Sequence, residues 1–365
     1  MLFPENTLLD TTLIDLAEEV ATSLAPRIDP LSCDRWLARS VIQKAVRRAE
    51  PDLAIRAVAN LFEHDRRSMW RALTIIACED VGVANIDVLA RIVASQQDRK
   101  WRQSVGGDWP VVAELVRQMA ESNHCQAACD LLLKAINDPA YRPHRDDALD
   151  GSIDEMIAGI ADRSRSITAR GVAVLATGGG LAEGQMHHDP AAVFDTLAEL
   201  NPFSHVVATC RIAWKISRNP MAMLLPLVWQ VWSSAPTGEM SDDLTPPVQL
   251  TSGIPGYALD QFTRRGNIVS RALVADNPDM RGMLDAAGIG SDQYATTVGD
   301  LIFLLEGTAL RRRLVWQGGD ELRLPHRWLP AVARLGSHLD QALRLVEAKG
   351  SQIAKLRCVH LATLS

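Results

Sequence analysis

The sequence lacks the short motifs that identify many nucleotide-dependent and hydrolytic enzymes. Its 365 residues contain no G-x-x-x-x-G-K-S/T phosphate-binding loop, no dinucleotide-binding glycine fingerprint, no G-x-S-x-G and no H-E-x-x-H. The triple glycine at 178–180 has no lysine after it, so it is not a P-loop. We therefore expect no ATP hydrolysis, and we assign no catalytic residue, no cofactor and no metal.

Long apolar runs, a cysteine framework and an excess of positive charge are missing as well. The run NPMAMLLPLVWQVW contains two prolines and is too short to span a bilayer, and the first residues lack the charged start and apolar stretch of a secretory signal. Six scattered cysteines in so long a chain indicate reduced thiols and a cytoplasmic protein. Because the net charge is −6, any nucleic-acid-binding surface must be a local patch.

What the chain does have is helical periodicity, in a composition typical of globular proteins (47% hydrophobic, 22% charged). In the segment 12–26, Leu13, Leu16, Val20 and Leu24 share one face. The same reasoning predicts helices over 34–49, 51–64, 68–80, 85–101, 110–122, 124–137, 153–161, 189–200, 203–216, 220–232, 257–272, 296–313 and 327–348. The sequence therefore predicts an all-α, multi-helix protein.

Two features interrupt this pattern. The segment 312–324 is predicted to form a short β-hairpin, with Gly318 and Gly319 at its turn. Residues 236–256 are rich in proline, glycine and polar residues, which is typical of a linker or long loop. We therefore expect a helical domain over 1–235 and a second, mainly helical domain over 257–365.

The stretch MWRALTIIACEDVGVAN places Glu79 and Asp80 where a helix is expected to end. A carboxylate there faces the negative end of the helix dipole, which costs from a few tenths to about 1 kcal/mol, so we expect a compensating cation. Lys44 and Arg47, which are neighbours on one face of an earlier helix, are the candidates. We predict that Glu79 is partly buried and paired with one of them, and that Asp80 contributes less to stability. A catalytic carboxylate pair is the alternative, although adjacent helical residues point about 100° apart.

The block from 43 to 89 resembles the helical collar of the RarA/MgsA family of AAA+ ATPases, which are related to the Werner-helicase-interacting protein. The family has a Lys-x-x-Arg pair, a second helix, an arginine pair and a Ser-Glu-Asp-x-Gly turn in this order. The matching residues are Lys44, Arg47, Asp52, Ala54, Ala57, Arg71, Glu79, Asp80 and Gly82, with Cys78 in place of the serine.

The resemblance implies a collar-like helical bundle that forms homo-oligomers in DNA-processing work. It also implies a structural ion-pair motif made of Lys44, Arg47, Arg71, Glu79 and Asp80. The ATPase module of the family has no counterpart here, because the P-loop is absent. The chain thus resembles a collar without its motor.

Two short basic segments, HDRRSMWR and DRKWR, are candidates for contact with a phosphate backbone and stacked bases. The residues that we assign to nucleic-acid binding are Arg66, Arg67, Arg99, Lys100, Trp101 and Arg102. Arginine outnumbers lysine 32 to 6, which suits bidentate phosphate contacts but also follows from a GC-rich genome. Solvated helix ends with a half-buried tryptophan are the alternative interpretation.

Cysteine and histidine residues form two weaker patterns. Cys125 and Cys129 share a helix face beside His124, but a zinc site needs about four ligands, so buried core thiols are the better interpretation. His187, His188 and Asp189 follow a glycine-rich loop and fit either a metal or phosphoryl site or an ordinary helix cap.

The segment GIPGYALDQFTRRGN combines turn residues with polar side chains. Tyr257, Asp260, Thr263 and Arg264 are candidate ligand-binding residues, because their spacing would place Tyr257, Asp260 and Arg264 on one helical surface. A loop and an amphipathic helix packed on a core are the alternative.

Three functional hypotheses remain open from the sequence. The first is a non-ATPase accessory protein of DNA replication or repair that oligomerises and binds single-stranded or forked DNA or a partner protein. The second is a metal- or phosphate-dependent enzyme built on the loops 177–190 and 253–267. The third is a protein-binding adaptor, for example a partner of an AAA+ motor or of a mobile-element or phage-defence system.

Overall fold

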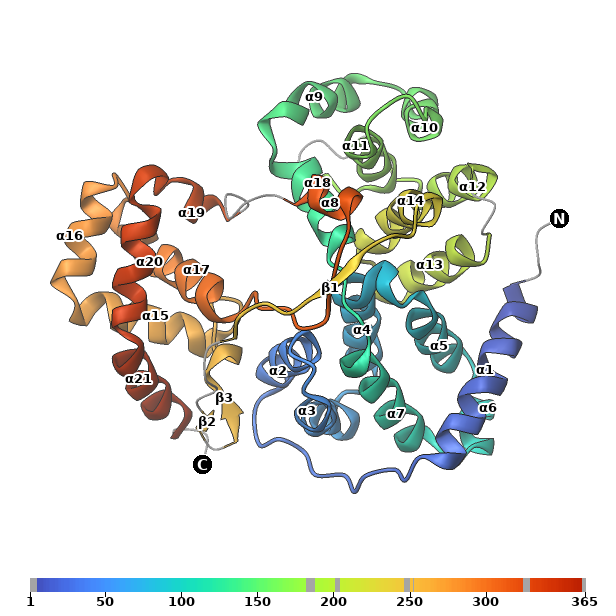
Figure 1. Ribbon diagram of the computed structural model, residues 1–365, viewed down its shortest axis with the longest axis horizontal. Coiled ribbons are helices and arrows are strands. Elements are labelled where there is room, and N and C mark those ends of the chain that lie inside the picture. The colour runs from blue at the N-terminus through green and yellow to red at the C-terminus, as the bar shows by residue number, and fades with distance from the viewer. Residues whose placement is uncertain are drawn as a thin grey trace. The chain divides into compact units, whose positions relative to one another are not determined.

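The computed structural model describes residues 5–181, 188–200, 204–245, 250–251, 253–323 and 329–362 (Figure 1). Helices dominate this part of the chain, and its strands form two small two-stranded sheets. The prediction of an all-α, multi-helix protein is therefore confirmed. None of the described helices is long and apolar enough to cross a membrane.

The first of two compact units comprises residues 1–27, 66–241 and 312–324. Its helices are α1 (Glu5–Thr22), α4 (Arg66–Ile76), α5 (Ile86–Gln97), α6 (Arg99–Ser104), α7 (Asp108–Glu121), α8 (Ala127–Asn137), α9 (Arg142–Asp150), α10 (Ile153–Ala161), α11 (Ile167–Gly178), α12 (Pro190–Leu200), α13 (Ser204–Ser217), α14 (Met221–Ser234) and α18 (Gln317–Leu322). Strands β1 (Glu239–Ser241) and β4 (Arg313–Val315) pair in antiparallel fashion. Three single turns complete the unit: the π-helical η1 (Ala77–Val81) and the 3-10 helices η2 (Gly82–Ala84) and η3 (Pro139–Tyr141).

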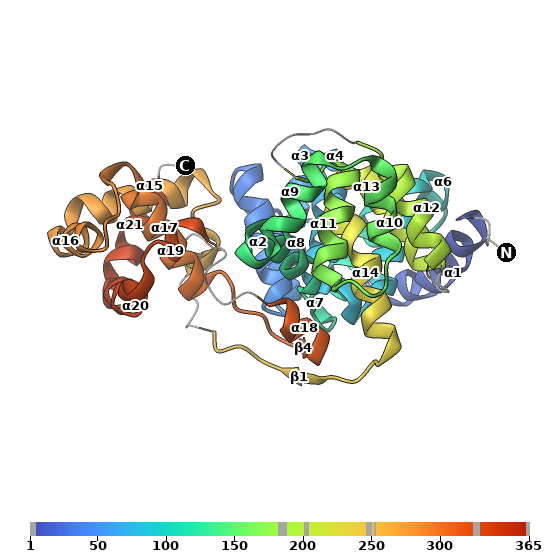
Figure 2. The ribbon, with the colours of Figure 1, turned by 90° about the horizontal axis from the view of Figure 1, so that it is seen from above.

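The core of the first unit is built around α14. The apolar run that is too short to span a membrane lies in this helix, and its residues 221–228 are all buried. Helices α8, α11, α12 and α13 pack against α14, and Figure 2 shows α8 and α11, which also contact each other, side by side. A helix that is apolar on all sides is stable here because neighbouring helices cover it all round.

The second unit comprises residues 28–65, 242–311 and 325–365. Its helices are α2 (Arg35–Arg47), α3 (Pro51–His64), α15 (Arg264–Asp276), α16 (Pro278–Ala286), α17 (Tyr294–Glu306), α19 (Pro330–Ala333), α20 (Leu339–Ala348) and α21 (Gly350–Ala362). Strands β2 (Leu250–Thr251) and β3 (Ile254–Pro255) and the 3-10 turns η4 (Gly256–Ala258), η5 (Ser291–Gln293) and η6 (Gly336–His338) complete it. Helix α2 packs on α3, and α15 packs on α17 and α21. Leu273, Leu284, Val298 and Leu301 lie in the apolar core between α15, α16, α17 and α20.

The units differ from the domains expected from the sequence. The first unit does end near the expected linker, after Ser241, but residues 28–65 belong to the second unit and residues 312–324 return to the first. The segment 312–324 also differs in detail. Its strand β4 is present, but it pairs with β1, and Gly318 and Gly319 lie in α18 instead of at a hairpin turn.

Candidate functional site

The two basic segments singled out in the sequence meet at the carboxylate of Asp108, the first residue of α7. Arg66 Nη1, at the start of α4, lies 2.9 Å from Asp108 Oδ2, and Arg102 Nε, in α6, lies 2.8 Å from Oδ1. Arg102 also lies over the ring of Trp70 in α4, 5.4 Å from its centroid. Arg102 of α6 and the start of α4 therefore lie close together in the first unit.

The outer residues of these two segments form what we call the basic surface, which consists of Arg66, Arg67, Arg99, Lys100 and Trp101. The four cationic side chains are exposed, and Trp101 is half-buried. Within the described part of the chain, Arg67, Arg99 and Lys100 make no ion pair. These three side chains can contact phosphates without first breaking an ion pair, whereas Arg66 is paired with Asp108.

Arg102 does not belong to this surface, and its assignment to nucleic-acid binding is corrected here. The residue is 6% exposed, and its guanidinium donates to the carbonyl oxygens of Ser95 and Gln96 as well as to Asp108. A cation that holds a carboxylate and two carbonyls in the interior is not available to a phosphate group. Its role is to fix α6 against α5 and α7.

The end of α4 is shaped by a π-helical turn that the sequence did not predict. Residues 77–81 form η1, and Gly82 follows with a φ of 54°. A Cβ at Gly82 would lie 2.3 Å from the carbonyl oxygen of Cys125, so only glycine fits this close approach. The Asp80 carbonyl accepts from the backbone N–H of Cys125 at 2.8 Å, which joins this turn to the start of α8.

Asp80, not Glu79, is the more buried of the two carboxylates. Asp80 is 0% exposed and accepts a hydrogen bond from Gln126 Nε2 at 2.8 Å, whereas Glu79 is half-buried. The expectation that Asp80 contributes less to stability therefore has no support from burial. The pairing of Glu79 with Lys44 or Arg47 would join the two compact units and stays a prediction.

Within the second unit, the collar-like cations have other partners. Lys44 Nζ lies 2.6 Å from Asp260 Oδ2 and donates to Ser40 Oγ at 2.7 Å. The Arg47 guanidinium donates to the carbonyl of Gly307 at 3.3 Å. In the first unit, Arg71 Nε donates to the carbonyl of Ser217 at 3.0 Å. Apart from the Lys44–Ser40 bond within α2, each of these contacts ties a helix to a distant segment, as expected of structural residues.

The candidate ligand-binding segment is mostly buried, and its expected helix begins later than predicted. Residues 254–258 form β3 and η4, and α15 starts only at Arg264, with Thr263 as its N-cap. Tyr257, Asp260 and Arg264 therefore do not share a helical face. Tyr257 is 4% and Asp260 3% exposed, and the Tyr257 hydroxyl donates to Glu50. Of the four candidates, only Arg264 is exposed to solvent.

Ser40, Lys44 and Asp260 lie close together, as serine and lysine do in some hydrolases, but their arrangement does not favour nucleophilic catalysis. The Ser40 hydroxyl donates to the Ala258 carbonyl at 2.8 Å, and Ser40 is 9% exposed. A general base must be neutral to accept a proton, whereas Lys44 forms a close ion pair with a carboxylate. This cluster anchors the loop before α15 on α2.

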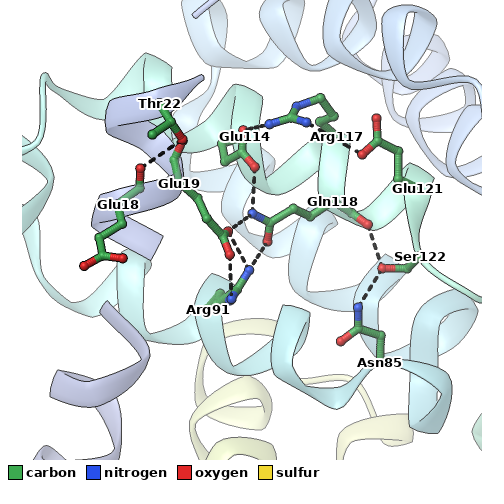
Figure 3. Close-up of polar contacts among 10 residues, drawn as sticks. All are labelled: Glu18, Glu19, Thr22, Asn85, Arg91, Glu114, Arg117, Gln118, Glu121 and Ser122. Atoms are coloured by element: carbon green, nitrogen blue, oxygen red, sulfur yellow. Dashed lines mark hydrogen bonds and ion pairs between the residues drawn. The ribbon is translucent and has the colours of Figure 1, made fainter. Parts of the chain in front are cut away.

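In the first unit, a polar network holds α1 against α5 and α7 (Figure 3). Arg91 of α5 binds both carboxylate oxygens of Glu19 in α1, at 2.7 and 3.0 Å, and donates to Gln118 Oε1 of α7 at 2.8 Å. Gln118 Nε2 in turn donates to Glu19 and, at 2.7 Å, to the buried Glu114. Since every one of these polar groups has a partner in the chain, the network is structural.

The cysteine and histidine patterns do not form a metal site in the described part of the chain. No group of three or more His, Cys, Asp or Glu side chains there is arranged to hold a metal ion. Burial raises the pKa of the Cys125 thiol, and that of Cys78 to about 12, which is typical of inert core thiols. His124 is 0% exposed and lies 3.2 Å from the Met119 carbonyl. His187 lies outside the described residues.

Two acidic residues, Asp108 and Asp300, were not predicted from the sequence. Asp108 follows two glycines and has the appearance of an ordinary first-turn acid, yet it joins α4, α6 and α7. Asp300 lies in α17 in the second unit, is 3% exposed and accepts from the Gln261 side chain, and burial raises its pKa to about 7. A polar residue on the apolar face of the predicted helix 296–313 was the one available hint for Asp300.

Comparisons of this chain with protein-family models, with curated proteins and with solved structures found no match.

Proposed function

We propose that this chain is a non-ATPase accessory protein of DNA replication or repair that binds single-stranded or forked DNA through the basic surface. The observation that supports the proposal is the meeting of the two basic segments at Asp108, which binds both Arg66 and Arg102. The exposed cations Arg67, Arg99 and Lys100 are close to these two residues in the sequence. The collar resemblance supplies the link to replication and repair.

The chemistry of the basic surface favours the sugar-phosphate backbone over sequence readout. Arginine and lysine contribute charge-assisted contacts to phosphates, and a half-buried tryptophan offers one ring face for a base. The rest of the molecule carries excess negative charge, since the net charge is −6. Binding is therefore weak, local and strongly dependent on salt.

The test is a fluorescence anisotropy titration with labelled oligothymidylate and with a labelled forked duplex, repeated over a range of salt concentrations. We expect binding at low ionic strength that weakens as salt rises. Combined Arg67→Glu, Arg99→Glu and Lys100→Glu substitutions should abolish it, and single alanine variants should reduce the salt slope by roughly 0.7–0.9 per lost phosphate contact. Arg142→Glu, at an exposed arginine of α9 in the same unit, is the matched control.

Arg102 is left unchanged in this experiment because it is buried. If the wild-type chain does not bind either DNA at low ionic strength, or if the triple variant binds as well as Arg142→Glu, the proposed function is wrong. The protein-binding adaptor then becomes the leading hypothesis. In parallel, calorimetry should detect neither binding nor hydrolysis of ATP, because the chain has no P-loop.

The proposal includes self-association, which is carried by the collar resemblance alone. Light scattering coupled to size-exclusion chromatography measures the mass of the particle in solution. A multiple of the 40.0 kDa chain mass supports a homo-oligomer, and a monomer at all concentrations removes this part of the proposal without affecting DNA binding.

A further inference from the structure

The first unit contains an open groove of about 870 Å³ at the end of the β1–β4 sheet. None of the residues that line it belongs to the basic surface. Three segments line it: Thr237, Gly238 and Glu239; Val315 and Trp316; and Gln317, Asp320 and Glu321. Its volume lies within the range of ligand sites in proteins.

The floor of the groove is rigid. Trp316 is 6% exposed and meets the ring of Trp232 edge-on at 5.3 Å between centroids. Gly318 and Gly319 lie so close to the Trp316 ring that a Cβ on either would be within 2.5 Å of it. The Trp316 indole N–H faces the buried Cys125 thiol without a hydrogen bond of normal geometry, so this wall contains a donor that lacks a strong acceptor.

The rim of the groove is acidic. Glu239, Asp320 and Glu321 are exposed carboxylates, and no arginine or lysine is among the lining residues. None of the ion pairs in the described part of the chain involves these three side chains. Lys134 of α8 donates to the backbone carbonyl of Glu321, but the three carboxylates themselves make no ion pair with any described residue. Together they favour a cationic ligand, because like charges repel one another and an opposite charge relieves the repulsion.

The strand beside the groove has an open edge. Strand β1 pairs with β4 on one side, and among the described residues no strand pairs with its other side. All three of its residues are exposed. An unpaired strand edge offers backbone N–H and C=O groups to an extended peptide, which can add to the sheet as a further strand.

We propose that this groove binds an extended, arginine- or lysine-bearing peptide segment of a partner protein, which adds to the open edge of β1. Alternate residues of an extended chain point to the same side. Cationic residues at every second position of the peptide therefore all face the rim formed by Glu239, Asp320 and Glu321. The residues between them point to the opposite side of the added strand. This interaction is independent of the proposed DNA binding.

The probe is a fluorescein-labelled peptide of sequence Arg-Val-Arg-Val-Arg, titrated with the full-length protein at low and moderate salt. We expect saturable binding, with no binding of the matched Glu-Val-Glu-Val-Glu peptide. The combined variant Glu239→Gln, Asp320→Asn and Glu321→Gln should weaken binding at least about tenfold, since an exposed ion pair contributes up to roughly fivefold. Glu199→Gln, at an exposed glutamate of α12, is the control and should bind as the wild type does.

Two further experiments distinguish binding by strand addition from binding by charge attraction alone. A probe with N-methyl groups on alternate backbone amides keeps its charge but cannot form a strand ladder, and we expect it to bind weakly. Equal binding of this probe, or displacement of the peptide by spermine at equal concentration, would overturn strand addition. Unchanged binding to the triple carboxylate variant, or no binding of the arginine probe at low salt, would overturn the groove as the site.

Discussion

Lys44 Nζ and Asp260 Oδ2 lie 2.6 Å apart in the second unit, with side chains only 6% and 2% exposed. Both residues were singled out in the sequence, but in separate motifs. Their pairing joins α2 to the loop before α15, and the Ser40 hydroxyl reinforces it by donating to the Ala258 carbonyl. A buried pair of this kind is costly to break because one charge is left without compensation.

The first prediction concerns this pair. Asp260→Asn should keep the hydrogen bond from the Phe262 backbone N–H, lose the charge, and lower the free energy of unfolding by about 3–5 kcal/mol. Arg56→Ala, which removes the exposed pair with Asp29 in the same unit, should cost under about 1 kcal/mol. Urea unfolding at constant salt measures both. Similar losses for the two variants would show that the buried pair has no special role.

The second prediction concerns Gly82. Gly82→Ala should lower the free energy of unfolding by at least 1–2 kcal/mol, because an alanine there is strained at positive φ and its Cβ meets the Cys125 carbonyl. Gly282→Ala, inside α16 with open space around the site, should instead raise it by roughly 0.4–1 kcal/mol. Thermal unfolding compares the two. A neutral Gly82→Ala would contradict the close approach of Gly82 to the Cys125 carbonyl.

The third prediction is a pH dependence from Asp300. Burial raises the pKa of this carboxyl to about 7, well above its value in an unfolded chain, so the folded state retains a proton that the unfolded state has lost. Between about pH 4 and 7 this residue therefore makes stability fall as pH rises, by up to roughly 1.4 kcal/mol per pH unit. Below pH 4 both states are protonated and the effect vanishes.

Asp300→Asn tests this dependence, because the amide keeps the shape of the side chain and removes its charge. The variant should be more stable than the wild type at pH 8, equally stable near pH 4, and less sensitive to pH in between. Chemical unfolding at a series of pH values measures the difference. A variant that is less stable at pH 8 would show that the ionised carboxylate is favoured in the folded protein.

The fourth prediction separates interior from surface cations in the first unit. Arg102→Ala should cost roughly 3 kcal/mol of stability, because Asp108 loses a buried partner and two carbonyls lose their donor. Arg99→Ala should change stability by less than about 0.5 kcal/mol. Melting temperatures and DNA affinity are measured on the same samples. If Arg102→Ala leaves the melting temperature unchanged, its placement in the interior is wrong.

Periodicity was sufficient to predict most helices, and α3 and α10 have the predicted limits. Periodicity failed where a helix has few buried apolar residues or departs from the regular helical repeat. Helix α9 has a single buried residue, Ala148, and η1 departs from the helical repeat. The start of α15 was misplaced because Tyr257 and Asp260 have helical spacing, although the proline at 255 and the N-cap Thr263 mark a loop between them.

The partners of the site residues were harder to predict from the sequence than the helices were. The sequence predicts Glu79 as a partner of Lys44 or Arg47, and that pairing stays a prediction. It did not indicate Asp260, which the structure places beside Lys44. Neither residue spacing nor composition indicates which distant segments of the chain pack together in one compact unit. The segments 28–65 and 242–311 share one compact unit only because their apolar faces and buried charges fit one another.

This discontinuity has a consequence for synthesis on the ribosome. Ser40 and Ala258, which bond to each other in the second unit, are 218 residues apart in the chain. At roughly 5–20 residues per second, α2 emerges about 10–40 s before its partner loop exists. During this interval Lys44 has no Asp260 and the apolar face of α2 has only α3 to cover it. Because the second unit also includes residues 325–365, it is complete only when nearly the whole chain has been translated.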